Sequence, residues 1–483
     1  MRVLLIQPPI EDFYTTPIRL YPLGLLYAAR VLDDAGAEVG ILDCLKPLWK
    51  RKIPIPASFG YLPPLDEIPY FFKGYYRFGL DAEQIIARVK EFSPDLVGIS
   101  SQFTAYYKSV EELSRLIKRE FRIPVFIGGN HATVFAAEIR RRTPEIDFVL
   151  EGPAEECLPP FLTQIGLKSR AYKQVARAER DQTDHTERPH RRQTLKESMP
   201  TERELSQTVP VKRPDWRKIQ PSHHLLRGEE YRVGRKNCIS LSASRGCPYG
   251  CDFCSVRRMF GRDIRYREID AVLAEMRWNY ARKETRLFNF EDDNLSYNRS
   301  WFLEFLNAVA SDRDMKDIEL AAMNGLCANT LDGEVLTAMR RSGFREINLS
   351  LVTRSEELQR RHRRPYLSDR ADRFDNLIKT ARELSFFITV YVILGLPGQS
   401  YVEVKESVDH LLDLGVLVGP SVFYLAPGSR LYEEMNVPLD LKDDWNLYRS
   451  SAFAVETSGL NRRRLFELFS YVRRKNLERK GVR

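Results

Sequence analysis

Short apolar runs alternate with amphipathic stretches over the first 165 residues of the chain. The runs end in polar residues or glycine, which is typical of strands buried on both faces, and the stretches between them repeat apolar residues at helical spacing. We expect strands at residues 3–6, 39–42, 95–100, 125–127 and 148–150, with helices at 23–35, 82–92, 110–121 and 133–142. This α/β order predicts a doubly wound, Rossmann-like parallel sheet over residues 1–165, and such sheets bind ligands at the carboxyl ends of their strands.

The same alternation returns in the second half of the chain, with strands expected at 239–243, 286–290, 318–323, 347–352, 388–394 and 421–425. A closed barrel of eight strand–helix units needs roughly 250 residues. Because only six units occupy residues 236–430, the pattern predicts a partial, open (βα)6 barrel of the TIM type. Residues 431–483 have mostly helical patterns and follow the barrel as a helical C-terminal segment.

Two stretches do not fit the alternation. Residues 47–79 combine many prolines with many aromatic residues and predict an excursion from the first domain without a recognisable pattern. Residues 166–235 are polar and basic and almost lack apolar periodicity, which predicts a linker between the two domains.

The net charge of +9 over 483 residues is concentrated in two segments. Residues 168–218 hold 14 Lys or Arg against 8 Asp or Glu, and residues 460–483 hold 9 against 2. The body of the chain is therefore slightly acidic, and a basic face for nucleic acid is not indicated there. Solvated segments account for the two basic stretches more simply, so we expect no nucleic-acid partner.

Neither a disulfide framework nor a membrane or secretion signal is evident. Seven cysteines are present, and three of them lie within eight residues, which is not the arrangement of a disulfide-stabilised fold. No run of 18 apolar residues could form a membrane-spanning helix, and the apolar start of the chain is too short for a secretory signal. We therefore expect a cytoplasmic protein with no transmembrane segment.

The three clustered cysteines form the motif Cys247-Pro-Tyr-Gly-Cys251-Asp-Phe-Cys254, directly after the first strand of the expected barrel. Thiolates are the ligands of iron–sulfur clusters, and four are usual. A [4Fe–4S] cluster held by three leaves one iron open for another ligand. The competing zinc site would need four ligands in paired spacings, and no second pair lies nearby. Gly246 and Gly250 would let the loop wrap closely.

This C-x3-C-x2-C motif ahead of six strand–helix units resembles the radical S-adenosylmethionine (SAM) superfamily. The resemblance implies that the open iron binds SAM, which one electron then cleaves to give a 5′-deoxyadenosyl radical. It implies SAM contacts from residues at successive strand ends: Phe253, Asp292, Asp293, Asn324, Ser350, Gly395 and Pro397. One departure is Val352, at a position where many members of the superfamily carry a glutamate; Ser350 or Thr353 could substitute for it.

The first domain resembles the cobalamin-binding domains that are fused to radical SAM barrels, through Gln7-Pro8-Pro9, Pro22-Leu23-Gly24, Val97-Gly-Ile-Ser100, Gly128-Gly-Asn-His-Ala-Thr133 and Glu151-Gly152. The resemblance implies cobalamin contacts from Pro8, Pro9, Ser100, Ser101, Gly128, Gly129, Asn130, Glu151 and Gly152. Glycines there would let the backbone approach a bulky ligand. No Asp-x-His-x-x-Gly motif is present, so we expect base-off cobalamin without a histidine ligand. A domain of the same fold that has lost cobalamin binding is the alternative.

The two resemblances together imply a cobalamin-dependent radical SAM methyltransferase with a [4Fe–4S] cluster, SAM and cobalamin as cofactors. Enzymes of this class transfer a methyl group from methylcobalamin to an unactivated carbon or to phosphorus. The substrate, a small molecule or a lipid, is not identified by the sequence, and neither are the catalytic residues. An external electron donor of the flavodoxin or ferredoxin type is expected.

Three alternatives stay open. Some cobalamin relatives carry out ring contraction or oxidative cyclisation instead of methyl transfer. An RNA-modifying methylthiotransferase would explain the basic segments, but that group carries an N-terminal cysteine trio, and only Cys44 and Cys157 lie in this region. A cobalamin- or redox-sensing binding protein is disfavoured by the intact cysteine motif. Separately, the Arg-Arg-His-Arg-Arg stretch at 360–364 could hold a phosphate or carboxylate, or form a solvated turn.

Overall fold

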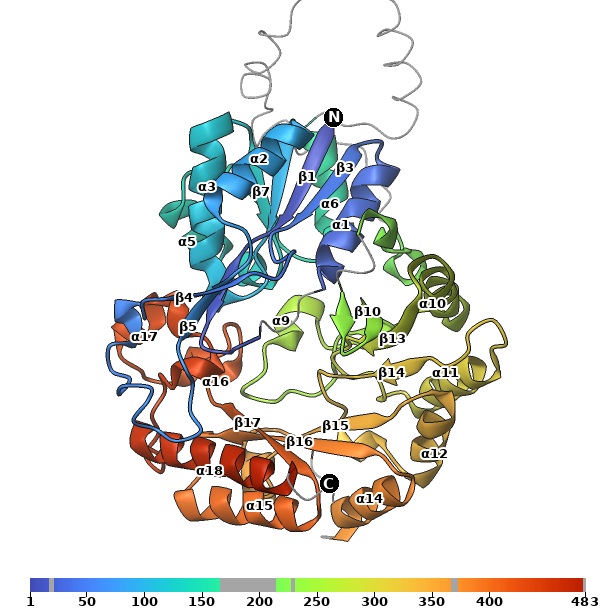
Figure 1. Ribbon diagram of the computed structural model, residues 1–483, viewed down its shortest axis with the longest axis vertical. Coiled ribbons are helices and arrows are strands. Elements are labelled where there is room, and N and C mark those ends of the chain that lie inside the picture. The colour runs from blue at the N-terminus through green and yellow to red at the C-terminus, as the bar shows by residue number, and fades with distance from the viewer. Residues whose placement is uncertain (17–20, 166–213, 227–230, 366–371, 481–483) are drawn as a thin grey trace, which may run out of the picture. The chain divides into compact units, whose positions relative to one another are not determined.

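The computed structural model describes residues 1–16, 21–165, 214–226, 231–365 and 372–480 (Figure 1). The chain divides into two compact units, and neither is one continuous segment. The first unit comprises Met1–Ile10, Pro22–Lys50 and Phe78–Leu226, and the second comprises Glu11–Tyr21, Arg51–Arg77 and Arg227–Arg483. Most of the basic stretch expected as a linker lies outside the described residues.

A five-stranded parallel sheet forms the centre of the first unit, in the order β3-β1-β6-β7-β8. Its strands are β1 (Arg2–Gln7), β3 (Glu38–Asp43), β6 (Leu96–Ser100), β7 (Val125–Gly128) and β8 (Phe148–Val149). All five occur where the apolar runs predicted them. Because β1 pairs in parallel with both β3 and β6, the strand order reverses direction there. Such a switch point is where open α/β sheets bind ligands.

Helices cover both faces of this sheet, with α1 and α6 on one side and α3 and α5 on the other (Figure 1). The helices are α1 (Leu23–Asp34), α2 (Ala82–Phe92), α3 (Tyr107–Phe121), α4 (Asn130–Val134), α5 (Ala136–Arg142) and α6 (Ala154–Gln164). A capping box starts α2, in which the side chains of Asp81 and Gln84 each accept a bond from the other's backbone N–H. The single helix expected at 133–142 is wrong: Phe135 leaves the helical conformation (φ −114, ψ 26) and separates α4 from α5.

Six parallel strands in two sets of three build the second unit. The first set is β10 (Lys236–Leu241), β13 (Thr285–Phe290) and β14 (Glu319–Ala321), with β9 (Arg232–Val233) antiparallel at its edge. The second set is β15 (Glu346–Val352), β16 (Phe387–Leu394) and β17 (Leu417–Val422). Isolated parallel bridges, Leu320 with Phe344 and Leu326 with Leu349, connect the two sets. No ladder within the described residues joins β17 back to β10, so the expected open barrel is confirmed.

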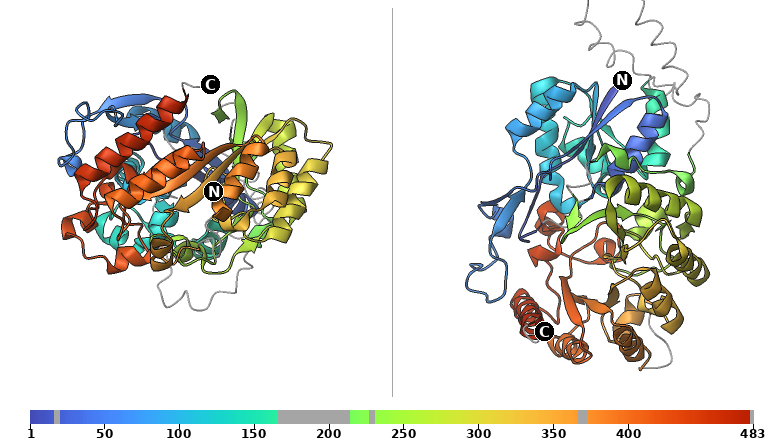
Figure 2. Two further views of the ribbon diagram at one scale, coloured as in Figure 1. Left: turned by 90° about the horizontal axis from the view of Figure 1, so that it is seen from below. Right: turned by 45° about the vertical axis from the view of Figure 1, so that its right-hand side comes forward.

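The connecting helices lie on the outside of the barrel strands (Figures 1 and 2). They are α10 (Ile269–Lys283), α11 (Arg299–Ser311), α12 (Gly333–Ser342), α14 (Asp372–Glu383) and α15 (Tyr401–Asp413). Aromatic contacts join helices to strands; for example, Phe290 of β13 packs edge-on against Phe305 of α11, with ring centroids 5.5 Å apart. Such a pair contributes about 0.5–1.5 kcal/mol beyond the burial of its area.

The C-terminal segment covers the edge strand of the barrel. It contains α16 (Arg430–Glu434), α17 (Leu439–Asp443) and α18 (Arg462–Lys480). Asn476 of α18 accepts a hydrogen bond from Val418 N (3.1 Å) and donates one to Val418 O (2.7 Å), so the open edge of β17 is paired. The strand expected at 421–425 is misplaced: β17 starts at Leu417, ends at Val422 and contains Pro420. Position 420 faces the same side of β17 as position 418, whose N–H points away from β16. The ladder with β16 therefore does not need the N–H that Pro420 lacks.

Two segments from the first 80 residues pack within the second unit. They contribute to a three-stranded sheet in the order β2-β5-β4, formed by β2 (Ile10–Asp12), β4 (Lys50–Ile53) and β5 (Tyr75–Phe78). Phe71 is 1% exposed and contacts Phe453, Phe466 and Phe469, with ring centroids 5.2, 5.3 and 5.8 Å away. The excursion at 47–79 therefore has a defined structure, and its aromatic content is explained by this packing.

Candidate cluster and cofactor sites

The three cysteines of the motif lie in one loop after β10. The loop leaves through β11 (Ser244–Arg245) and returns through β12 (Arg265–Tyr266), and these two short strands pair antiparallel. Between them the chain carries the cysteines and the short helix α9 (Val256–Phe260). The paired strands close the loop at its base, so its two ends are held together before any ligand is considered.

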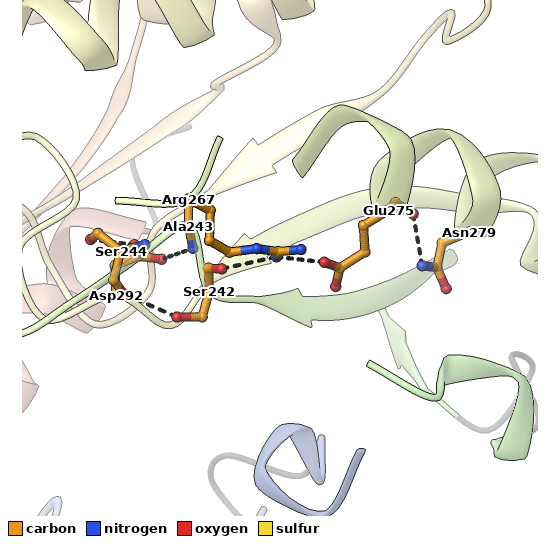
Figure 3. A network of polar contacts seen from close by, with 7 residues as sticks. All are labelled: Ser242, Ala243, Ser244, Arg267, Glu275, Asn279 and Asp292. Atoms are coloured by element: carbon orange, nitrogen blue, oxygen red, sulfur yellow. Dashed lines mark hydrogen bonds and ion pairs between the residues drawn. The ribbon is translucent and has the colours of Figure 1, made fainter. Parts of the chain in front are cut away.

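The turn after β13, which contains Asp292 and Asp293, holds the start of the cysteine loop in place (Figure 3). Asp292 accepts hydrogen bonds from Ala243 N (3.1 Å), from the backbone N–H of Ser244 and from the Ser244 hydroxyl (2.6 Å). Asp293 accepts one from Gly246 N (3.0 Å). Asp292 is 4% exposed, and this burial raises the pKa of its carboxyl to about 7. Both aspartates hold the backbone of the loop, a role that the sequence did not predict, and the SAM contacts expected from them stay predictions.

A buried ion pair between Arg267 and Glu275 lies next to the start of the cysteine loop (Figure 3). The guanidinium of Arg267 lies 2.5 Å from Glu275 of α10, and the two side chains are 0% and 1% exposed. Arg267 also donates from Nη1 to Ser242 O (3.1 Å) and from its backbone to Ala243 O (2.8 Å). On the same helix, Asn279 donates to Glu275 O (2.9 Å). The pair ties α10 to the chain just before the cysteines, and no local pattern in the sequence marked either residue.

The thiols themselves suit a shared cluster. Cys251 is buried, Cys247 is half-buried and Cys254 keeps exposed surface. Desolvation raises the pKa of the thiols of Cys247 and Cys251, and the nearby Cys251 adds to the rise at Cys247. Asn294 Nδ2 lies 3.7 Å from Cys247 Sγ, and Arg364 Nη1 lies 4.0 Å from Cys251 Sγ. Donors directed at ligating sulfurs are one of the means by which proteins tune iron–sulfur clusters.

Two glycines allow the loop its close contacts. A Cβ at Gly246 (φ +91) would lie 2.5 Å from Asp263 O, and a Cβ at Gly250 would lie 2.6 Å from the guanidinium of Arg257. No three His, Cys, Asp or Glu side chains within the described residues are arranged around a position for a single metal ion. In a [4Fe–4S] cluster each cysteine binds a different iron, so three thiolates spaced around one loop fit the cluster.

His362 links the cysteine loop to the Gly-Leu-Pro-Gly turn after β16. Its Nε2 lies 2.7 Å from Pro397 O, its ring lies 6.5 Å from the ring of Phe253, and its carbonyl accepts a bond from Asp252 N (3.0 Å). His362 is 2% exposed, and desolvation lowers its pKa, so the neutral imidazole donates from Nε2 to Pro397. Phe253 and Pro397, both expected at SAM, are thus brought to the same histidine. This role of His362 was not predicted from the sequence, where the residue is marked only by its position among four arginines.

Other residues expected at SAM lie at neighbouring strand ends. The side-chain oxygen of Gln399 accepts a bond from Gly395 N (2.9 Å) and so fixes the turn after β16. On β15, Ser350 N donates to Leu326 O (3.0 Å). Asn324 precedes Leu326 by two residues in the connection after β14. Contacts of Gly395, Ser350 and Asn324 with SAM stay predictions.

The end of β15 departs from regular geometry. Val352 has φ +78, which is rare for a β-branched residue, and the ladder with β16 changes register between Ser350 and Val352. Thr353 is 1% exposed and its hydroxyl donates to Glu403 (2.6 Å). Because that hydroxyl is engaged, the half-buried Ser350 is better placed than Thr353 to substitute for the missing glutamate.

In the first unit, the residues expected at cobalamin gather at the carboxyl ends of four parallel strands. Pro8 and Pro9 follow β1, Ser100 and Ser101 end and follow β6, Gly128, Gly129 and Asn130 end and follow β7, and Glu151 and Gly152 follow β8. The carboxyl ends of parallel strands meet at one edge of a sheet. The structure therefore places all nine residues along the same edge, and their contacts with cobalamin stay predictions.

Three observations fit a bulky ligand at this edge. The hydroxyl of Ser101 is buried and has no hydrogen-bond partner among the described residues. A Cβ at Gly128 or at Gly152 would meet no other atom within 4 Å, so the backbone borders open space there. Gly129 has φ +118, and a Cβ on it would lie 2.7 Å from Ser101 O. The turn after β7 therefore requires glycine at position 129.

His131, the next imidazole along this turn, is part of the core. It is 1% exposed and its ring lies 4.7 Å from that of Tyr107 and 5.1 Å from that of Phe135. Its Nδ1 lies 3.1 Å from the hydroxyl of Thr104. Burial lowers the pKa of His131 to about 3, so the imidazole is neutral at physiological pH.

Comparison with known families covers both halves of the chain. Residues 241–411 match the model of the Radical SAM superfamily, and residues 74–162 match the model of the B12 binding domain. The chain belongs to the radical SAM proteins that carry a cobalamin-binding domain. The family, the α/β fold class and the set of three cofactors predicted from the sequence are thereby confirmed.

Individual relatives extend over most of the chain. The chain is 26% identical over 461 residues to cytidylyl-2-hydroxyethylphosphonate methyltransferase of Streptomyces wedmorensis, covering 90% of this chain and 81% of that one. It is 25% identical over 364 residues to the anaerobic magnesium-protoporphyrin IX monomethyl ester cyclase of Synechocystis, covering 74% and 62%. Among solved structures, the radical SAM methyltransferase TsrM of Kitasatospora setae, with cobalamin and a [4Fe–4S] cluster bound, aligns with a TM-score of 0.58. That alignment has 18% identity and covers 89% of this chain and 73% of TsrM, which shows the shared fold.

Proposed function

We propose that this chain is a cobalamin-dependent radical SAM methyltransferase whose substrate is a small molecule. The observation that carries the proposal is the presence, in one chain, of a three-thiol loop on an open barrel and a B12-binding sheet. A methyltransferase of Streptomyces wedmorensis matches 90% of this chain over 81% of its own length, which supports methyl transfer.

Each cofactor has residues that would hold it. Cys247, Cys251 and Cys254 would bind the cluster; Phe253 and Pro397, joined through His362, would border SAM. Along the edge of the first sheet, the orphaned hydroxyl of Ser101 and the open backbone at the glycines after β7 and β8 would border cobalamin. When bound, the cofactors supply a transferable electron, an adenosyl radical source and a methyl carrier.

The chain's own groups supply position and rigidity. Asp292 and Asp293 hold the start of the cysteine loop, and the ion pair of Arg267 with Glu275 holds the chain behind it. Gln399 fixes the turn that borders SAM. A radical reaction needs its partners fixed in place and shielded, and a loop held by buried bonds from several elements meets that need.

The test measures where the methyl group of SAM is transferred. The anaerobic chain, reconstituted with iron and sulfide, is supplied with cobalamin, titanium(III) citrate and SAM that carries a trideuterated methyl group. A methyltransferase should form S-adenosylhomocysteine and place the deuterated methyl group on cobalamin, both measured by mass spectrometry. Protein that forms 5′-deoxyadenosine but neither of these products would contradict methyl transfer.

A cyclase is the second candidate. The similarity to the magnesium-protoporphyrin IX monomethyl ester cyclase over 364 residues supports it. A cyclase would use SAM only as a source of the adenosyl radical, so it would release 5′-deoxyadenosine and leave the methyl group of SAM in methionine. The labelling assay therefore separates the two candidates without knowledge of the substrate.

We also propose a cellular location and partners for this protein. Within the described residues, none of the helices is both long and apolar enough to cross a bilayer. We propose a cytoplasmic enzyme, because a thiolate-held cluster and seven cysteines without a disulfide among them suit a reducing compartment. A flavodoxin- or ferredoxin-type protein would supply the electron. We propose no nucleic-acid partner; salt-dependent binding of transfer RNA would contradict this.

A further inference from the structure

Arg364 reaches the cysteine loop from the turn that follows α13 (Glu356–Arg361). Its Nη1 lies 4.0 Å from Cys251 Sγ, and its Nη2 donates to the carbonyl of Ser350 on β15. The backbone N–H of Arg364 donates to Gln359 O (2.8 Å) and closes the turn. The guanidinium is therefore held beside the thiol by protein groups alone.

Within the part of the chain that the structure describes, the charge of Arg364 has no carboxylate partner. The side chain is only partly exposed, and no Asp or Glu among the described residues forms an ion pair with it. Its contact with a group that can become an anion is with the thiol of Cys251, which lies 4.0 Å from Nη1. Its neighbour Arg363 differs, because it lies 3.6 Å from Asp252. Taking a cation out of water without a counter-charge is costly, so the position of Arg364 calls for an anion at the thiols.

We propose that Arg364 is the counter-charge of the iron–sulfur cluster and raises its reduction potential. A [4Fe–4S] cluster with three thiolate ligands is negatively charged, and it gains one further negative charge when it accepts an electron. A fixed cation beside a ligating sulfur stabilises the reduced form more than the oxidised form. Arg364 thereby makes the first step, reduction by an external donor, easier. It acts through the cluster, so it is a positioning residue and not a catalytic one.

The test is a redox titration of the reconstituted chain in the absence of SAM, followed by electron paramagnetic resonance. Dithionite supplies the one electron that converts the oxidised cluster to the reduced, paramagnetic form. Arg364→Gln should lower the ratio of reduced to oxidised cluster at a fixed solution potential at least about tenfold, which is 59 mV for a one-electron couple. Arg364→Lys keeps the charge and should stay within about threefold of the parent, as should the matched control Arg363→Gln.

Each outcome decides the question. A potential for Arg364→Gln that equals that of Arg363→Gln overturns the proposal. The titration is then repeated with SAM added, and a shift that appears only in this second titration also overturns the proposal, because Arg364 would then be a SAM-binding group. If Arg364→Gln takes up no iron, the lysine variant decides: a parent-like potential supports the proposal, and a large fall contradicts it. The titration needs no substrate and no methyl transfer, so failure of the proposed function would leave its result standing.

Discussion

We expect Glu275→Gln to destabilise the second unit by about 3 kcal/mol. Glu275 and Arg267 are 1% and 0% exposed, so the substitution removes the charge of Glu275 from beside a buried cation. Breaking a buried pair by removing one partner costs about 3–5 kcal/mol, because the remaining charge is still desolvated. The glutamine carbonyl can still accept a hydrogen bond from Arg267, which places the expected cost near the lower end of that range.

Urea unfolding of the cluster-free chain, followed by tryptophan fluorescence, measures this cost. The indole N–H of Trp301 donates to Arg267 O (3.1 Å), so one of the tryptophans reports directly on the region. Asp270→Asn is the matched control, since it removes an exposed carboxylate from the first turn of the same helix and should cost about 0.3–1 kcal/mol. The double substitution Arg267→Met with Glu275→Leu should recover most of the loss, because both charges are gone. A cost for Glu275→Gln no greater than that of Asp270→Asn would refute the reasoning.

Three further predictions concern the cofactor sites. Cys251→Ala should abolish the visible absorbance and the bound iron of the cluster, whereas Cys327→Ala, which removes a buried cysteine outside the motif, should retain both. The carboxyl of Asp292 has a pKa of about 7 in the folded chain and about 4 in the unfolded chain. Its contribution to the free energy of unfolding is therefore complete below pH 4 and is lost as the pH rises to 7. Urea midpoints over this range should fall with rising pH, and less steeply in Asp292→Asn. Gly129→Ala puts a Cβ 2.7 Å from Ser101 O and should weaken cobalamin binding about tenfold in a spectroscopic titration, and an unchanged affinity would contradict cobalamin at that edge.

The strands of the parallel sheets could be predicted because they contain apolar runs bounded by polar residues or glycine, as at 125–128, whereas β4, which reads Lys-Arg-Lys-Ile, could not. Where tertiary packing overrides local preference, the sequence was insufficient. No helix was expected at α6, which contains Pro159 and Pro160 in its interior, yet the burial of Leu158 and Phe161 keeps the segment helical. The late start predicted for β17 has the same origin, since a proline is tolerated on an edge strand at a position whose N–H would face away from the ladder.

Some residues of the candidate site could likewise be predicted from the sequence, and others could not. The cysteine ligands could be predicted because their spacing is contained in eight consecutive residues. The groups that hold them could not, because they come from distant parts of the chain. Asp292 and Ser244 are 48 positions apart, and Arg364 and Cys251 are 113 apart. Such pairs depend on how βα units are arranged around the barrel, and a single sequence carries no local pattern for them.

The aromatic segments from the first 80 residues have a consequence for synthesis of the protein. Phe71 is made 382 residues before its partner Phe453 and 398 residues before its partner Phe469. At about 5–20 residues per second, the early segment waits roughly 20–80 s for them. During that time its apolar side chains are available to chaperones, and to other nascent chains. A gene fragment that starts at residue 236 would lack Phe71 and would leave Phe453, Phe466 and Phe469 without this contact, so the barrel should be produced only together with the early segments.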